Sequence, residues 1–253
     1  LAIGALCAAC GAEPRAVTPT VQSVERLQPL VDAAPVGSVL QVPAGTWSGP
    51  VLIEKAMTID GAGAAVVTGN GRGTVITVRA AGVTIRGLRV TGSGESHDAM
   101  DAALLIEADD ARIEHNTLDD VLFGVFVKGV HRALICGNVI TSKLEDHSLR
   151  GDGVRVWNGS GNRVFGNDVV NARDVTLANA RGNLVAHNRI RGGRYGLQLV
   201  FAPGNVIEDN VLDGNLTGIA VLYSNGVSIR RNVVQHSRGV SGAGRVFKES
   251  GQA

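Results

Sequence analysis

One hydrophobic pattern recurs along most of the chain, and each copy is centred on an asparagine. An aliphatic residue stands three positions before the asparagine, and another stands two positions after it. Further on, a glycine precedes two apolar residues at alternate positions, as in Gly196 with Leu197 and Leu199. Alternation of this kind is typical of short β-strands. The central asparagines, spaced by 22, 29, 21, 22 and 22 residues, are Asn116, Asn138, Asn167, Asn188, Asn210 and Asn232.

This period predicts a solenoid, because a unit of about 22 residues cannot bury its apolar face without stacking on its neighbours. We predict an all-β fold, a right-handed parallel β-helix with coils of about 22 residues. Asparagine tolerates left-handed backbone, and its amide can bond to the asparagine of the next coil, about 4.8 Å away. The six asparagines are therefore predicted to form a ladder. A leucine-rich repeat has a similar period but needs a frame of leucines, whereas this chain favours Val, Ile and Gly.

The start of the chain has the composition of a targeting segment. Residues 1–12 contain the apolar run LAIGALCAAC, and polar residues follow from Glu13. We interpret residues 1–12 as the remnant of a secretory signal, cut after Ala12 or, as in a lipoprotein anchored at the cysteine, before Cys10. A redox or metal site formed by Cys7 and Cys10 is less favoured, because no second cysteine pair accompanies it.

The rest of the chain divides into a cap and a long repeat region. Residues 13–37 are predicted to form an N-terminal helical cap, and residues 38–253 the β-helix. A helical pattern over 21–34 is expected to cover the open end of the first coil. No polar cap follows the last coil, so we expect the natural protein to be longer at both ends. The apolar side of the helix is formed by Val24, Leu27, Leu30 and Val31.

Composition agrees with a narrow coil and excludes some functions. Glycine accounts for 34 of 253 residues and aromatic residues for only 4%, which suits frequent turns around a core of small aliphatic side chains. The formal net charge of +1 gives no extended electrostatic field, so neither a nucleic acid nor a membrane surface is indicated as a partner. No transmembrane span is predicted.

Catalysis on uronate polysaccharides is the first function to test, because many β-helices perform it with clustered carboxylates and a base. Alignment of the coils gives two outward columns, and neither contains an acidic pair. Asp152 aligns beside Arg173 of the next coil and is interpreted as an ion pair. Glu145 and His147 are the remaining acid–base candidates. The columns are Phe126, Arg155, Thr176, Gln198 and Ala220, and Lys128, Trp157, Ala178, Val200 and Leu222.

Metal binding is the second function. His115 and His187 share a column but are separated by three coils, about 14 Å at the strand spacing, so they cannot hold one ion. The best local group is His97, Asp98 and Met100, where an imidazole and a thioether would suit a soft ion such as Cu(I). One imidazole and one thioether are few ligands, so we expect copper binding to be weak or to depend on a partner.

A partner surface is the third function. The second outward column is largely apolar, and aromatic residues flank it. An apolar face on the outside of a solenoid favours a covering partner, although another part of the same chain could also cover it. The residues of this predicted partner surface are Phe126, Trp157, Val200, Phe201, Leu222 and Tyr223.

Several of these segments resemble the NosD family, the periplasmic β-helix proteins for copper insertion into nitrous-oxide reductase. The resemblance spans most of residues 38–250 and includes VLFGVFVKGVHRALICGNVI (121–140), RYGLQLVFAPGNVIEDN (194–210) and GRVFKES (244–250). It implies a periplasmic part that works with an ABC transporter and a copper chaperone and has no catalytic activity of its own. The family tends to carry methionine before Tyr-Ser in the last two repeats, where this chain has Val200 and Leu222.

The sequence thus favours a non-catalytic periplasmic scaffold in copper-centre maturation. Replacement of the two family methionines by aliphatic residues weakens direct copper binding but keeps an apolar docking surface. The alternative is a carbohydrate-active β-helix, a lyase or epimerase on uronate polysaccharides.

Overall fold

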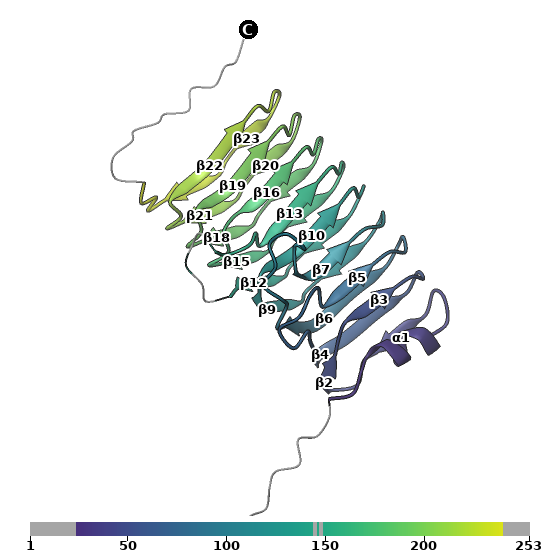
Figure 1. Cartoon of the computed structure of the whole chain (residues 1–253). Coiled ribbons are helices and arrows are strands. Elements are labelled where there is room, and N and C mark those ends of the chain that lie inside the picture. Colours follow the sequence, from purple (N-terminus) through teal and green to yellow (C-terminus); the bar gives the residue numbers. More distant parts are fainter. Residues whose placement is uncertain (1–23, 144–145, 147–148, 240–253) are drawn as a thin grey trace, which may run out of the picture.

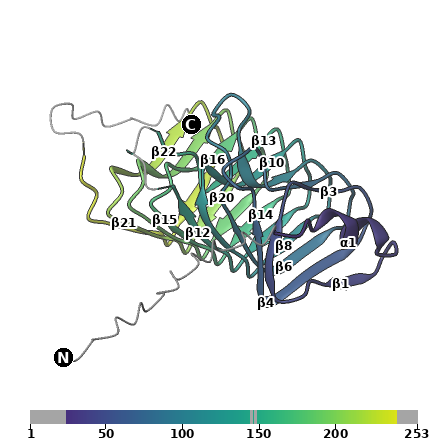
Figure 2. The same ribbon diagram turned by 60° about the horizontal axis from the view of Figure 1, so that its bottom comes forward.

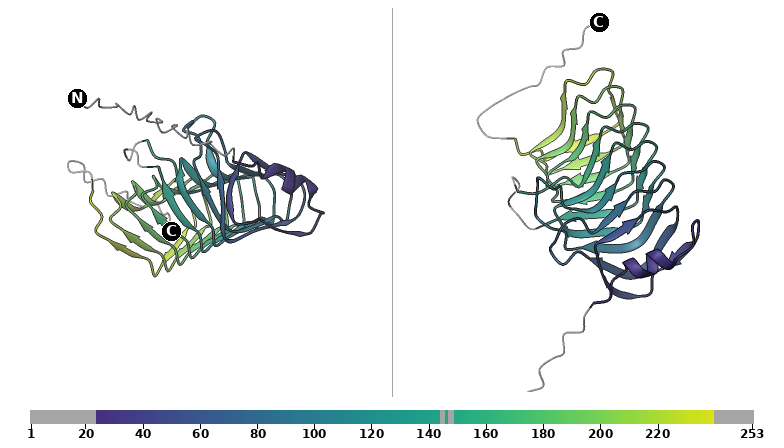
Figure 3. Two further views of the ribbon diagram at one scale, coloured as in Figure 1. Left: turned by 90° about the horizontal axis from the view of Figure 1, so that it is seen from below. Right: turned by 45° about the vertical axis from the view of Figure 1, so that its right-hand side comes forward.

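The computed structural model describes residues 24–143, 146 and 149–239. The described chain winds into a parallel β-helix of about nine coils, which confirms the predicted fold class (Figure 1). The coils follow one another in single file, and each strand away from the ends of the stack pairs with a strand of the coil before and the coil after it (Figure 3).

One side of the coils forms an eight-stranded sheet. Its strand order is β22-β19-β16-β13-β10-β7-β5-β3, and the pairing is parallel throughout. The strands are β3 (Val51–Ile53), β5 (Ile76–Val78), β7 (Ala102–Ile106), β10 (Phe123–Lys128), β13 (Val154–Trp157), β16 (Val175–Ala178), β19 (Tyr195–Val200) and β22 (Thr217–Leu222).

The other side forms a sixteen-stranded sheet that divides into two ladders beyond β6. The first strands of the chain pair into it through β4. The strands are β1 (Val39–Gln41), β2 (Gly45–Ser48), β4 (Thr58–Thr68), β6 (Thr84–Thr91), β8 (Arg112–Glu114), β9 (Thr117–Val121), β11 (Leu134–Cys136), β12 (Val139–Ser142), β14 (Arg163–Phe165), β15 (Asp168–Val170), β17 (Leu184–Ala186), β18 (Arg189–Arg191), β20 (Val206–Glu208), β21 (Val211–Asp213), β23 (Ser228–Arg230) and β24 (Val233–Gln235).

Small aliphatic side chains fill the interior of the coils. Val125, Val154, Val175 and Leu197 occupy equivalent positions on four successive strands and are almost completely buried. Each side chain therefore packs on its counterpart one coil away, which removes apolar surface from water along the whole axis. This core explains why the sequence uses β-branched residues and few aromatics.

The predicted asparagines stack in the turn between the two ladders of the sixteen-stranded sheet. The side-chain nitrogen of Asn167 donates to the side-chain oxygen of Asn188 at 2.9 Å, and Asn188 donates in the same way to Asn210 at 2.9 Å. Each amide nitrogen also donates to a main-chain carbonyl, such as that of Val164 for Asn188. All three asparagines are buried, so the ladder satisfies polar groups that water cannot reach.

A second asparagine ladder, which our sequence analysis missed, runs along another turn. Asn162 donates from its side chain to Asn183 at 3.1 Å, and Asn183 donates to Asn205 at 3.0 Å. All three are buried. The signal was present in the sequence as a Gly-Asn pair at spacings of 21 and 22 residues. We overlooked it because the first asparagine ladder already accounted for the period of about 22 residues.

The N-terminal helix is shorter than predicted. Helix α1 (Gln28–Ala33) lies against β3 at the first coil (Figure 2). The Gln28 side chain bonds to the main chain of Leu52. Leu27 and Val31 enter the core as expected, but Val24 is exposed rather than on the buried side. The reason is that the chain before the helix pairs with β2, because the Leu27 amide bonds to the carbonyl of Ser48. The predicted signal segment lies outside the described residues.

Candidate functional site

The apolar column predicted from the sequence forms a stripe on the outer face of the eight-stranded sheet. Its five members are in register on β10, β13, β16, β19 and β22. From β13 onward each member is partly exposed. We call these the outer stripe; its residues are Lys128, Trp157, Ala178, Val200 and Leu222.

One residue predicted to lie on the exposed partner surface, Phe126, is buried instead, so this part of the prediction is wrong. Phe126 is only 3% exposed and belongs to a small second core outside the coils, with Leu122 and Phe123. Met100, from the loop between β6 and β7, packs against this cluster. Trp157 stacks on Phe126 with ring centroids 6.4 Å apart and marks the border of the outer stripe. The sequence could not show that a loop folds back over Phe126.

Two exposed aromatic residues flank the C-terminal half of the stripe. Phe201 and Tyr223 stack face to face, with centroids 5.0 Å apart and an interplanar angle of 12°. The exposed fraction is 55% for Phe201 and 79% for Tyr223. They stand on adjacent coils directly after Val200 and Leu222, so they extend the apolar surface around the edge of the sheet.

The predicted metal loop is engaged in structural contacts. Nε2 of His97 lies 2.8 Å from the carbonyl of Leu149, in the second irregular loop, and its ring packs edge-on to Phe123. Met100 contributes to the small core, while Asp98 is exposed. Within residues 24–143, 146 and 149–239, no group of three or more His, Cys, Asp or Glu side chains could hold a metal ion.

The other candidate ligands stay apart on the outer face of the sixteen-stranded sheet. His115 and His187 share a turn column three coils apart, as predicted, and His187 packs edge-on to Phe165. Cys136 is half-buried, and burial raises the pKa of its thiol. A protonated thiol is a poor nucleophile and metal ligand. Glu145 and His147, the predicted acid–base candidates, lie outside the described residues.

A buried acidic pair that we did not predict stands at the turns before β13 and β16 of the eight-stranded sheet. Asp152 accepts hydrogen bonds from Arg173 at 2.9 Å, as expected, and also from Arg155 at 3.0 Å. Asp174, on the next coil, is equally buried and accepts from Arg194 and from the Tyr195 amide. We missed the pair because the two carboxylates stand at the turn before the strands and not in the strand columns.

The electrostatics of this pair are those of a structural network. Burial raises the pKa of Asp152, while the guanidinium groups of Arg173 and Arg155 lower it and the carboxylate of Asp174 raises it. Arginine holds both oxygens of each carboxylate. A general base needs an oxygen that can reach the substrate's proton, and these oxygens are already occupied. The network therefore ties three coils together and offers no free acid–base group.

Comparison with solved structures identifies the class of protein. The chain superposes on an alginate lyase, AlyF-OU02 in complex with G6, with a TM-score of 0.57 and 17% identity, covering 84% of this chain and 57% of that one. It also superposes on the A-module of the mannuronan C-5 epimerase AlgE6 from Azotobacter vinelandii, with a TM-score of 0.56 and 14% identity, covering 85% and 74%. At these low identities the likeness shows the fold alone: the chain is one of the parallel β-helix proteins.

Sequence comparison is more specific. Residues 143–250 match the family described as "Periplasmic copper-binding protein (NosD)". The "Probable ABC transporter binding protein NosD" of Stutzerimonas stutzeri is 34% identical over 137 residues, and that of Pseudomonas aeruginosa is 28% identical over 138. These alignments cover 53% and 52% of this chain but 31% of each relative, so the chain spans about a third of their length. The resemblance to the NosD family is thereby confirmed over residues 143–250.

In the part of the chain that the structure describes, no helix is both long and apolar enough to span a bilayer.

Proposed function

We propose that this chain is a non-catalytic periplasmic scaffold that supports copper-centre maturation of nitrous-oxide reductase. The family match supports a periplasmic, copper-related role, and the relatives' name supports association with an ABC transporter. The proposed partners are that transporter and a copper chaperone, as the family resemblance implies.

The outer stripe carries the proposal. Trp157, Val200 and Leu222 lie inside the segment that matches the family, on the outside of a sheet whose own core lies on its other face. Phe201 and Tyr223 add exposed aromatic area at its edge. A contiguous apolar surface of this kind costs free energy in water and is typical of a protein interface, where aromatic side chains provide most of the binding energy.

Copper enters this proposal as a cargo that the partners help to hold. His97 supplies one imidazole and Met100 one thioether, and both already contact other parts of the chain. Cu(I) prefers two or three soft ligands. We therefore propose that copper binding by this chain alone is weak and tightens when a chaperone or transporter supplies further ligands.

The test is a pull-down of the transporter and the chaperone with two variants of this chain. Leu222→Glu places a charge at the C-terminal end of the outer stripe, beside Tyr223, and loss of the complex is expected because the charge would be buried without a partner. His97→Ala should leave the complex intact. Val139→Glu is the matched control, because Val139 is 45% exposed on the other sheet. A complex lost with His97→Ala but kept with Leu222→Glu would refute the proposed role of the outer stripe.

A further inference from the structure

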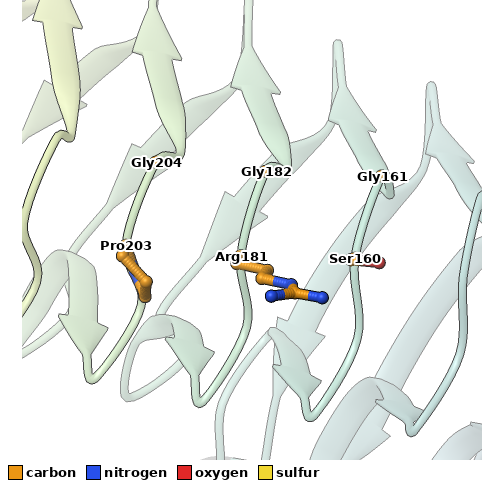
Figure 4. A pocket seen from close by; sticks show the side chains of 6 residues that line it. All are labelled: Ser160, Gly161, Arg181, Gly182, Pro203 and Gly204. Atoms are coloured by element: carbon orange, nitrogen blue, oxygen red, sulfur yellow. The ribbon is translucent and has the colours of Figure 1, made fainter.

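A shallow groove crosses the turns that follow the strands of the eight-stranded sheet. Its volume is about 380 Å³. Pro203, Arg181 and Ser160 line both this groove and the adjoining pocket shown in Figure 4, where they stand on three successive coils and the guanidinium of Arg181 points toward the coil of Ser160. Polar and aromatic side chains line it: His131, Asn158, Ser160, Asn179, Arg181 and Phe201.

At the aromatic end of this groove, bulky residues occupy a turn position that glycine or asparagine holds in earlier coils. Gly129, Asn158 and Asn179 hold the equivalent left-handed position in earlier coils, with φ between 49° and 68°. Phe201 and Tyr223 occupy the same position with φ of 49° and 51°. Left-handed backbone disfavours bulky side chains, and these rings remain largely exposed, so the fold gains little from them. An outlier of this kind points to binding.

The stacked pair leaves room for a third ring. Phe201 and Tyr223 stack at 5.0 Å, close to the spacing of about 4.8 Å between adjacent strands. Phe201 lines the groove, and the next position along the column is the short side chain of Asn179. A flat ring placed above Asn179 would continue the stack at a favourable distance for ring contacts.

The polar groups of the groove define the chemistry of that ring. Arg181 has no ion pair within the described ranges, and no carboxylate lines the groove. His131 contacts Ser160 at 2.7 Å through Nδ1. The groove therefore suits a ligand with one negative charge. The amides of Asn158 and Asn179 are exposed, and they match hydroxyl groups, which an aromatic side chain of a protein partner would leave unpaired.

We infer that the groove binds an acidic saccharide, with the sugar ring stacked on Phe201, its carboxylate paired with Arg181 and its hydroxyls bonded to Asn158 and Asn179. This site is non-catalytic and does not depend on the copper-maturation role proposed above. Arginine pairs well with carboxylates, and the carbon face of a sugar packs well on an aromatic ring.

The test is calorimetric titration of the unchanged chain with an alginate hexasaccharide, and with maltohexaose as the neutral counterpart. We expect saturable binding of the acidic sugar, at least about tenfold tighter than that of the neutral one. Phe201→Asn and Arg181→Gln should each weaken acidic-sugar binding by about tenfold or more. Asparagine already serves at this turn in two other coils, so Phe201→Asn should fold. Thermal melting checks this.

Arg163→Gln is the control, because Arg163 is an exposed arginine on the other sheet, and it should leave binding unchanged. Absence of saturable binding to the acidic hexasaccharide would overturn the inference. Equal binding in Phe201→Asn and Arg181→Gln would also overturn it. If Phe201→Asn abolishes the transporter or chaperone pull-down while no sugar binds, the aromatic pair belongs to the protein interface instead. The result of the Leu222→Glu pull-down, whether the complex is kept or lost, bears only on the scaffold role.

Discussion

At the scale of single residues, asparagine determines how this coil turns. In the first asparagine ladder, each side chain bonds to both neighbouring coils. The side-chain oxygen of Asn210 accepts from the side chain of Asn188, and the side-chain nitrogen of Asn210 donates to Asn232 at 2.9 Å. The main-chain amide of Asn188 also donates to the Asn210 oxygen. Asparagine is thus used both as a turn residue and as a continuous hydrogen-bonding column.

Asn210→Ala should cost about 1 to 3 kcal/mol of unfolding free energy, because it leaves buried donors and acceptors without partners. Urea denaturation measures this. Asn225→Ala is the control, since Asn225 is exposed, and it should change stability by less than about 0.5 kcal/mol. Equal effects of the two changes would contradict a stabilising role for the ladder.

At the scale of elements, ion pairs across coils differ according to burial. Asp152 is fully buried between Arg155 and Arg173, whose side chains are about one-fifth exposed. Asp168 and Arg191 form a similar cross-coil pair at 3.0 Å, but each is about a third exposed. Water can replace the partner in the second pair far more easily than in the first.

Asp152→Ala should therefore destabilise the chain by about 2 to 3 kcal/mol, because it leaves two guanidinium groups without their buried carboxylate. Asp168→Ala should cost less than about 1 kcal/mol. Chemical denaturation of both variants measures the difference. Similar losses would mean that the charge network contributes no more than a surface ion pair.

The last described coils carry an acid-sensitive surface cluster. Hydrogen bonds from Arg230 and Arg231 lower the pKa values of Glu208 and Asp209, respectively. The folded pKa values lie below the unfolded values of about 4, so this stabilisation is present above pH 4 and disappears as pH falls through the folded values. The double variant Glu208→Gln with Asp209→Asn should show a shallower fall of Tm in acid. High salt should shrink the difference, and identical curves would contradict it.

At the scale of the whole molecule, two irregular loops distinguish one part of the outer face of the eight-stranded sheet from the rest. The loop between β6 and β7 meets the loop between β12 and β13 through His97 and Leu149, and Lys143 lies 3.3 Å from Asp120. Together with Phe123 they cover the outer face of β7 and β10 in the eight-stranded sheet. The C-terminal part remains open, so the proposed partner surface and the proposed saccharide groove both lie there.

The arginine network around Asp152 and Asp174 leads us to predict no lyase activity on alginate or pectate. Asp152 and Asp174 are bonded to arginines and cannot abstract a proton from a sugar. Ultraviolet absorbance of unsaturated products is the measurement, and nuclear magnetic resonance of the treated polymer covers epimerisation. Product that appears with the unchanged chain and disappears with Asp152→Asn would favour the carbohydrate-active alternative over the scaffold.

The sequence by itself determined the solenoid, because a repeat in sequence becomes a repeat in space when each unit must stack to bury its apolar face. It also fixed the register of the outer stripe, since one coil length separates Trp157, Ala178, Val200 and Leu222. The first asparagine ladder followed from the same spacing. These features are local or periodic, and a period can be read along the chain.

Only the tertiary structure decided which side chains are covered by loops and which meet at the turns. The burial of Phe126 depends on a loop without a period, and its path is set by contacts with residues distant in sequence, such as those of His97 with Leu149. The pairing of Asp152 and Asp174 with three arginines likewise depends on turn geometry. The groove beside Phe201 exists because side chains of four coils meet there. Loop paths and turn geometry lack the repeat that made the coils predictable.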